Sequence, residues 1–268
     1  DSNVEFGASA FEDSGLQHVT CSPNPLSKDE ALQAPFCLPK MSSIPDFCFC
    51  KTRLRKVFIP DGVKSIGNQA FSTCAFLEQV ELPSTLTTLG KCAFDAAEQL
   101  ENVIVPQYVK VIPDYCFLRC HSLREVELLG VKSLGNMCFA HCSSLVSVKG
   151  IQNVCCYHGK PFDASSQLGT LVATQNFFQG PAQLCHKGQK LELLYNNHTL
   201  VGDLLQHAKH VFVAGEGTFL LRLKQYKKGV DIDFDDTDFS RPVVDFTKRA
   251  LNSDGTSLKF LQLELVKM

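Results

Sequence analysis

Apolar residues return along the first half of the chain with a regular period. The clearest position is a phenylalanine, which recurs at intervals of 22 or 23 residues at Phe49, Phe71, Phe94, Phe117 and Phe139. A leucine and a valine follow with the same period, at Leu54, Leu77, Leu100, Leu123 and Leu145 and at Val57, Val80, Val103, Val126 and Val148. A unit of this length cannot bury its own apolar face, so the pattern predicts a solenoid in which stacked coils share one core.

Each repeat also predicts two local elements. Residues 77–83 alternate between apolar and polar positions, which indicates a short strand. Val80 faces inwards there, and Gln79 and Glu81 face outwards. Residues 68–74 predict a single helical turn on the opposite side of the coil. We therefore expect the α/β fold class, as a solenoid of about six coils with short parallel strands and helical turns.

The solenoid begins with a shortened copy at Phe6 and Phe11, and about 15 extra residues separate this copy from the next one. We place this inserted loop at about 21–38, where prolines and serines are typical of a surface segment. The repeated phrase ends at Gly150, so the solenoid is expected to cover residues 1–150.

The second half of the chain has a different pattern. Residues 151–184 are mixed in character and predict a cap or linker that covers the end of the solenoid. Further on, strand-like runs at 190–195 and 218–223 flank a short helical segment. Residues 185–268 are therefore expected to form a small α+β domain, for which we recognise no family.

The full phrase of the repeat has a known counterpart. Residues 63–83 read Val-x-x-Ile-Gly-x-x-Ala-Phe-x-x-Cys-x-x-Leu-x-x-Val-x-Leu-Pro. This phrase closely resembles the BspA-type leucine-rich repeats of surface proteins of some bacteria and of proteins of several protists, and the resemblance covers roughly residues 1–150. It implies a curved solenoid with a binding or adhesive role, and it brings no catalytic residues.

The outward positions of the predicted strands form the candidate binding face. Apolar Phe58 and Ile104 stand there among polar neighbours, which is typical of a protein-binding patch. The candidate binding residues are Phe58, Gln79, Glu81, Asn102, Ile104, Glu125 and Glu127. We therefore expect a non-enzymatic module that binds protein partners through this face, and that is adhesive as in the family it resembles.

Two other classes of function stay open. The chain is alternatively a structural subunit of a larger intracellular assembly, in which residues 185–268 make the permanent contact. A thiol enzyme in the C-terminal half is the third class, with Cys185 or the histidines as its candidate groups. No Gly-x-Ser-x-Gly pattern, phosphate loop or dinucleotide motif accompanies them, so no catalytic residue is assigned.

Two positions of the repeat take a small residue: the one directly before the phenylalanine and the one three residues after it. Other copies fill them with alanine, serine or threonine, and six of the 13 cysteines occupy them: Cys48, Cys74, Cys116, Cys120, Cys138 and Cys142. Buried cysteine behaves as a small hydrophobe, so packing explains them. Zinc held by the last four is the alternative, but the chain has no C-x2-C pair.

Two further patterns suggest a metal and neither is complete. The acidic run 231–238 resembles a calcium loop, but Asp236 stands where glycine is required and Pro242 where glutamate belongs. His207 and His210 share one face of a predicted helix, where two ligands are too few and a solvated face explains them. We expect no metal and no cofactor.

Composition narrows the partners and the compartment. The formal net charge is −2 and 44% of the residues are hydrophobic, which excludes a disordered polymer and gives no global field for nucleic acid. No apolar run approaches the roughly 18 residues of a spanning helix, so we expect no membrane insertion. Because the number of cysteines is odd, complete internal pairing is impossible, and we expect the cytoplasm before the cell surface or secretion.

Overall fold

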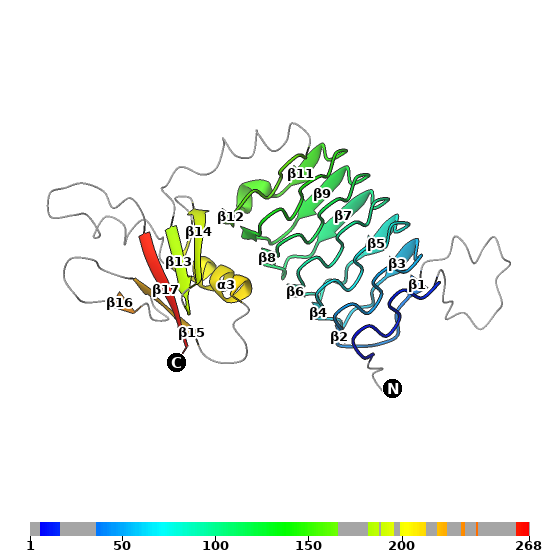
Figure 1. The fold of residues 1–268 in the computed structure, drawn as a ribbon, viewed down its shortest axis with the longest axis horizontal. Coiled ribbons are helices and arrows are strands. Elements are labelled where there is room, and N and C mark those ends of the chain that lie inside the picture. The colour runs from blue at the N-terminus through cyan, green and yellow to red at the C-terminus, as the bar shows by residue number, and fades with distance from the viewer. Residues whose placement is uncertain are drawn as a thin grey trace.

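The computed structural model describes two continuous stretches and several shorter segments: residues 6–16, 36–165, 182–187, 189–195, 199–212, 219–223, 232–233, 240 and 261–267. The longest stretch winds into a solenoid, and the segments after residue 181 gather at its C-terminal end (Figure 1). Most of the inserted loop and most of the acidic run lie outside the described residues.

The first strand of each coil joins one parallel sheet of six strands. Its order follows the chain: β1 (Phe36–Cys37), β3 (Lys56–Phe58), β5 (Gln79–Glu81), β7 (Asn102–Val105), β9 (Glu125–Leu128) and β11 (Ser147–Lys149). Val57 pairs with Val80 in this sheet, and Val126 pairs with both Val103 and Val148. The valine ladder of the sequence is therefore a column of inward side chains, one from each strand except β1.

A second, shorter strand follows in each coil. In the early coils these are β2 (Ser43–Ile44), β4 (Ser65–Ile66) and β6 (Thr88–Leu89), which form a three-stranded parallel sheet. In the later coils they are β8 (Val111–Ile112), β10 (Ser133–Leu134) and β12 (Cys156–His158). These last three are also parallel to one another and belong to an eight-stranded sheet that continues into the C-terminal part of the chain.

The phenylalanines stack along the middle of the solenoid. Neighbouring rings from Phe11, Phe49, Phe71, Phe94, Phe117, Phe139 and Phe162 lie 5.2–5.5 Å apart between centroids, with interplanar angles between 1° and 12°. The five central rings are completely buried. This continuous column confirms the shared core that the period predicted.

The column continues past Gly150, where the repeated phrase ends. Phe162 stacks on Phe139 at 5.5 Å, and Ser165 fills the small position three residues after it. The sequence hid this copy because Pro161 replaces the small residue before the ring and the spacing from Gly159 is one residue shorter than in the preceding copy. The solenoid therefore includes residues around Phe162 for which the sequence predicts a cap or linker.

The predicted helical turns are turns without a helix. Gln69 and Thr73 have φ of 54° and 58°, in the left-handed region, and every described coil has a residue or a pair of residues of this kind. The N–H groups of Gln69, Phe71 and Thr73 donate to carbonyls of the next coil at 2.6–2.8 Å. The left-handed residues turn the backbone N–H groups towards the neighbouring coil, so they cannot form the bonds of a helix.

The C-terminal segments extend the solenoid sheet. Their strands are β13 (Ala182–His186), β14 (Gln189–Tyr195), β15 (Phe219–Leu223), β16 (Ile232–Asp233) and β17 (Leu261–Lys267). β14 pairs antiparallel with β12, and the sheet order from there is β14-β13-β17-β15-β16. The described helices are η1 (Ile151–Asn153) and α3 (Val201–Val211), and α3 lies between these strands and the solenoid (Figure 1). A separate α+β domain is not confirmed by this continuous sheet.

Candidate functional site

The structure places the seven candidate binding residues on the outer face of the six-stranded sheet. Phe58 pairs with Glu81, and Ile104 pairs with Glu127. Asn102 pairs with Gln79 on one side and with Glu125 on the other. Six of the seven are exposed and Glu127 is half-buried, because β-strand alternation turns the valines between them inwards.

A groove of about 740 Å³ runs over the middle of this face. Its lining residues are Lys56, Glu78, Gln79, Val80, Glu81, Leu82, Glu101, Asn102, Val103 and Ile104. Four candidate residues line it, whereas Phe58, Glu125 and Glu127 are not among the lining residues. The sequence analysis missed Glu78 and Glu101, which occupy the same repeat position just before the outward strand, and this shared position is the signal that could have found them.

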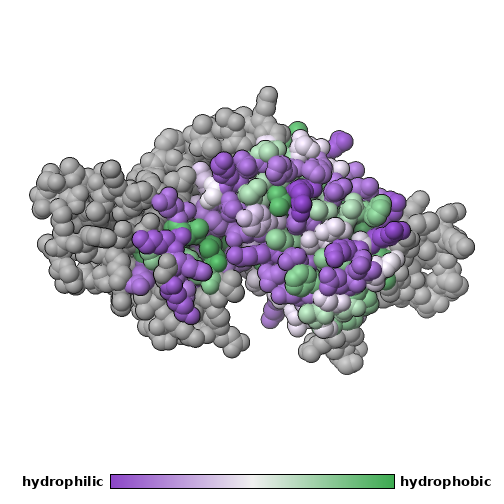
Figure 2. Space-filling view, in the orientation of Figure 1, coloured by the Kyte–Doolittle hydropathy of each residue, from purple (hydrophilic) through white to green (hydrophobic). Residues whose placement is uncertain are grey.

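The groove is acidic with an apolar patch. Three carboxylates and one ammonium group are among its lining residues, and Arg55 just outside pairs with Glu78 at 2.5 Å. Ile104, in β7, leaves 57% of its surface exposed, and Phe58, in β3 on the other side of β5, leaves 40% exposed. Across the visible side of the solenoid, polar and apolar residues alternate in small areas (Figure 2). The described lining of this groove includes no histidine, cysteine or hydroxyl side chain.

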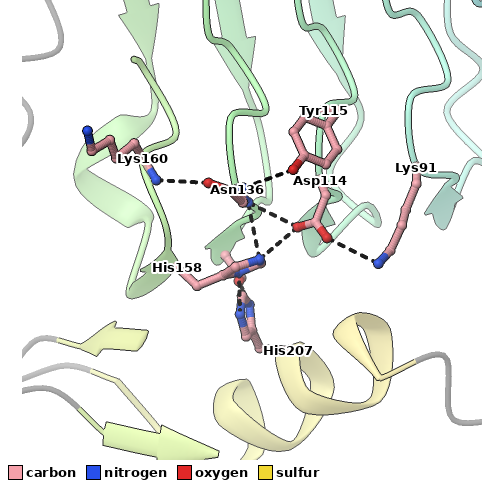
Figure 3. A network of polar contacts seen from close by, with 8 residues as sticks. Lys91, Asp114, Tyr115, Asn136, His158, Lys160 and His207 are labelled. Atoms are coloured by element: carbon pink, nitrogen blue, oxygen red, sulfur yellow. Dashed lines mark hydrogen bonds and ion pairs between the residues drawn. The ribbon is translucent and has the colours of Figure 1, made fainter. Parts of the chain in front are cut away.

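A second polar centre lies where α3 meets the last coils (Figure 3). Asp114 stands at its middle and accepts from the backbone N–H of Asn136 at 3.0 Å. Lys91 reaches the other carboxylate oxygen at 3.1 Å, and Nε2 of His158 approaches Asp114 at 2.7 Å. Burial alone would raise the pKa of Asp114, but the hydrogen bond from His158, together with the contact with Lys91, outweighs it and holds this pKa well below 3.8.

The chain of contacts continues from His158 into the helix. Nδ1 of His158 lies 2.9 Å from Nε2 of His207, and Nδ1 of His207 contacts the hydroxyl of Ser133. One proton arrangement satisfies every member: Ser133 donates to His207, His207 donates to His158, and His158 donates to Asp114. Burial lowers the pKa of His207 to about 3, so its imidazole is neutral.

This placement corrects the solvated face expected for the helix histidines. The side chain of His207 has no exposed surface, because that face of α3 packs on β10 and β12. Asp203 does not join the histidines either, since its carboxylate accepts from the backbone N–H of Leu200 at the start of the helix. Hydropathy could not reveal this arrangement, because histidine occurs on buried and exposed helix faces alike.

The repeat cysteines are buried free thiols. Cys120 and Cys142 each donate to the carbonyl of a phenylalanine in the preceding coil, at 3.3 and 3.2 Å. Burial raises the pKa of Cys142 to about 12 and that of Cys120 well above its usual value. Among the described residues, no three His, Cys, Asp or Glu side chains are grouped as metal ligands would be. Cys185, the candidate thiol of an enzyme, lies half-buried in β13.

The parallel strands, the ladder of phenylalanines and the short repeat define a leucine-rich repeat solenoid. Residues 42–169 match the model of the BspA type leucine rich repeat region in six copies. These residues are therefore a BspA-type leucine-rich repeat region. The C-terminal part has no family match.

Solved structures with similarity to this chain are bacterial leucine-rich repeat proteins. A leucine-rich cell surface protein from Faecalibacterium prausnitzii shares 25% identity over 49% of this chain and 35% of its own, with a TM-score of 0.42. The leucine-rich repeat protein of T. pallidum shares 22% identity over 52% of this chain and 81% of its own, with a TM-score of 0.38. The comparison with curated proteins gives no match. None of the described helices has the length and hydropathy to cross a bilayer.

Proposed function

We propose that the protein binds a protein partner through the outer face of the six-stranded sheet. The groove that includes Ile104 lies in the middle of this proposed binding surface. The groove itself carries this proposal: it is a concave surface in which exposed Ile104 lies among carboxylates, with Phe58 exposed outside the groove on the same sheet face. Leucine-rich repeat folds are typical of protein-interaction and adhesion modules, which supports the same function. The proposed role is adhesive or scaffolding rather than enzymatic.

The chemistry of the face defines the partner segment. The lining residues Glu78, Glu81 and Glu101 outnumber Lys56, so a segment with lysine or arginine is complementary to them. Because Ile104 and Phe58 are exposed and apolar, the partner segment also carries an apolar side chain next to its basic residue. We therefore propose a segment with an apolar anchor and a flanking basic residue. In the same proposal, α3 and the C-terminal strands form an α+β unit that docks on the last coils.

A peptide library displayed on phage and selected on the full chain tests this function. We expect enriched peptides to combine an apolar residue with lysine or arginine, and to lose at least about tenfold in affinity when Ile104→Ser and Phe58→Ser are introduced together. Phe76→Ser is the matched control, because Phe76 is also 40% exposed and lies outside the sheet. Peptides that bind the double variant as tightly as the unchanged protein would contradict the proposal.

A further inference from the structure

A second groove, of about 450 Å³, lies between the solenoid and the last turn of α3. The solenoid contributes Thr87, Thr88, Tyr108 and Lys110, and the helix contributes Lys209 and His210. Hydroxyl, ammonium and imidazole groups thus meet in one groove, and its described lining residues include no aspartate or glutamate. The chain as a whole has a net charge of −2, so this local excess of donors and positive charge is not a reflection of composition.

His210 has a buried nitrogen that nothing in the described structure satisfies. Its Nε2 is screened from solvent and has no hydrogen-bond partner among the described residues. An unsatisfied buried polar atom is costly and requires an explanation. His210 lines the groove through other atoms of its ring, so a small rotation of the imidazole brings Nε2 to an oxygen atom of a bound molecule, which accepts its proton.

The two lysines are available for the same oxygen atoms. Within the described structure neither Lys110 nor Lys209 pairs with a carboxylate, although Lys110 donates to the carbonyl of Gln107 at 2.7 Å. The nearby Asp114 is occupied by Lys91 and His158. The free carbonyl groups at the C-terminus of α3 favour a positive charge in the last turn, which explains Lys209. Lys110 comes from the solenoid, so the helix does not explain its position.

We propose that this groove binds a small organic anion whose phosphate or carboxylate oxygens contact His210, Lys110 and Lys209. The volume lies in the range of small-molecule sites, roughly 300–1,000 Å³. Tyr108 leaves 55% of its surface exposed and offers an aromatic ring beside the charged groups, so the ligand carries a planar or apolar part next to its anionic end. This site is on a different face from the proposed protein-binding groove and is independent of it.

Titration of the full chain with phenyl phosphate, benzoate and phenol, followed by calorimetry and by NMR of the histidine rings, tests the proposal. We expect saturable binding of an anionic probe and a shift of the His210 ring signals. If phenyl phosphate binds and benzoate does not, the ligand carries a phosphate. If benzoate binds and phenyl phosphate does not, the ligand carries a carboxylate. Lys110→Gln and Lys209→Gln are each expected to weaken binding about tenfold, since each removes a charge-assisted hydrogen bond.

Lys40→Gln is the control, because Lys40 is exposed and lies outside the lining of this groove. Lys110 is also exposed, so its substitution leaves the fold intact, which the melting temperature checks. Three results would overturn the site: no saturation by either anion up to about 10 mM, phenol binding as tightly as the anions, or an equal loss of affinity in the Lys40 variant.

Discussion

At the scale of single residues, cysteine, serine and threonine at the small position three residues after the phenylalanine have a role besides size, whereas Ala97 only fills the space. Cys120 donates to the carbonyl of Phe94, and Ser165 donates to the carbonyl of Phe139. Thr52 at the same position donates to the carbonyl of Phe49. Thiols and hydroxyls exchange there because each can satisfy a carbonyl that the turn leaves inside the core. Size alone had suggested the position was only a packing site.

The phenylalanine column makes a strong prediction about stability. Phe94 is completely buried between Phe71 and Phe117, so Phe94→Ala is expected to lower the free energy of unfolding by about 3–5 kcal/mol. Phe76→Ala removes a half-exposed ring and should cost less than about 1 kcal/mol. Denaturation in urea measures both changes. Equal losses of unfolding free energy in the two variants would show that burial in the phenylalanine column does not determine the stability of the core.

Burial also predicts the order in which the thiols react. Cys116, Cys120 and Cys138 have no exposed surface, and burial raises their pKa well above 9, so they expose little thiolate. Cys92 and Cys185 are half-buried. Alkylation of the native protein with iodoacetamide, read by mass spectrometry, should label these two before the other three. Early labelling of Cys120 in the folded protein would contradict the buried position.

At the scale of elements, the strands and their outward-facing residues could be predicted and the turns could not. Alternation such as Gln79-Val80-Glu81 predicts which side chains face outwards. The same alternation in five copies supports that prediction. The turn conformation depends on N–H groups that bond to the next coil, and no local pattern records those partners. The missed groove residues Glu78 and Glu101 precede their strands, where alternation gives no information.

The α3 interface predicts a loss of stability in acid. The pKa of His207 is about 3 in the folded chain against an ordinary 6.5, so the unfolded chain takes up a proton between these values that the folded chain does not. The free energy of unfolding therefore falls as pH drops through this range, by up to about 1.4 kcal/mol per pH unit for each such proton. Burial also lowers the pKa of His210, to about 4, and acts in the same direction.

Urea denaturation at a series of pH values between 7 and 4 measures this slope. His207→Gln keeps polar groups at the position but cannot take up the proton, so we expect a shallower slope in this variant. Asp114 adds to the loss only at lower pH, because its stabilisation is complete above 3.8 and disappears as it becomes protonated. His121→Gln is the control, since His121 is exposed. A slope unchanged by His207→Gln would refute the role of this histidine.

At the scale of the whole molecule, one sheet joins the solenoid to the C-terminal part of the chain. It includes β8, β10 and β12 of the late coils and the C-terminal strands. β12 is the junction, because it pairs with β10 of the solenoid and with β14 of the C-terminal part. Thr199, just before α3, donates to the carbonyl of Cys155 at 2.7 Å and ties the helix to the same junction. The β12 edge of the last coil is therefore covered by β14, and α3 packs along β8, β10 and β12.

In a solenoid each coil contacts mainly its neighbours, so a defect should loosen the structure locally. Leu204 is completely buried in α3, and Leu204→Ala is expected to lower hydrogen-exchange protection in β8, β10 and β12 while β3 and β4 keep theirs. Leu54, completely buried near the other end, gives the mirror experiment: Leu54→Ala should loosen β3 and β4 and spare β12. Exchange followed by mass spectrometry reads both variants. Uniform loss along the chain in either one would mean that the solenoid and its C-terminal cover unfold as a single cooperative unit.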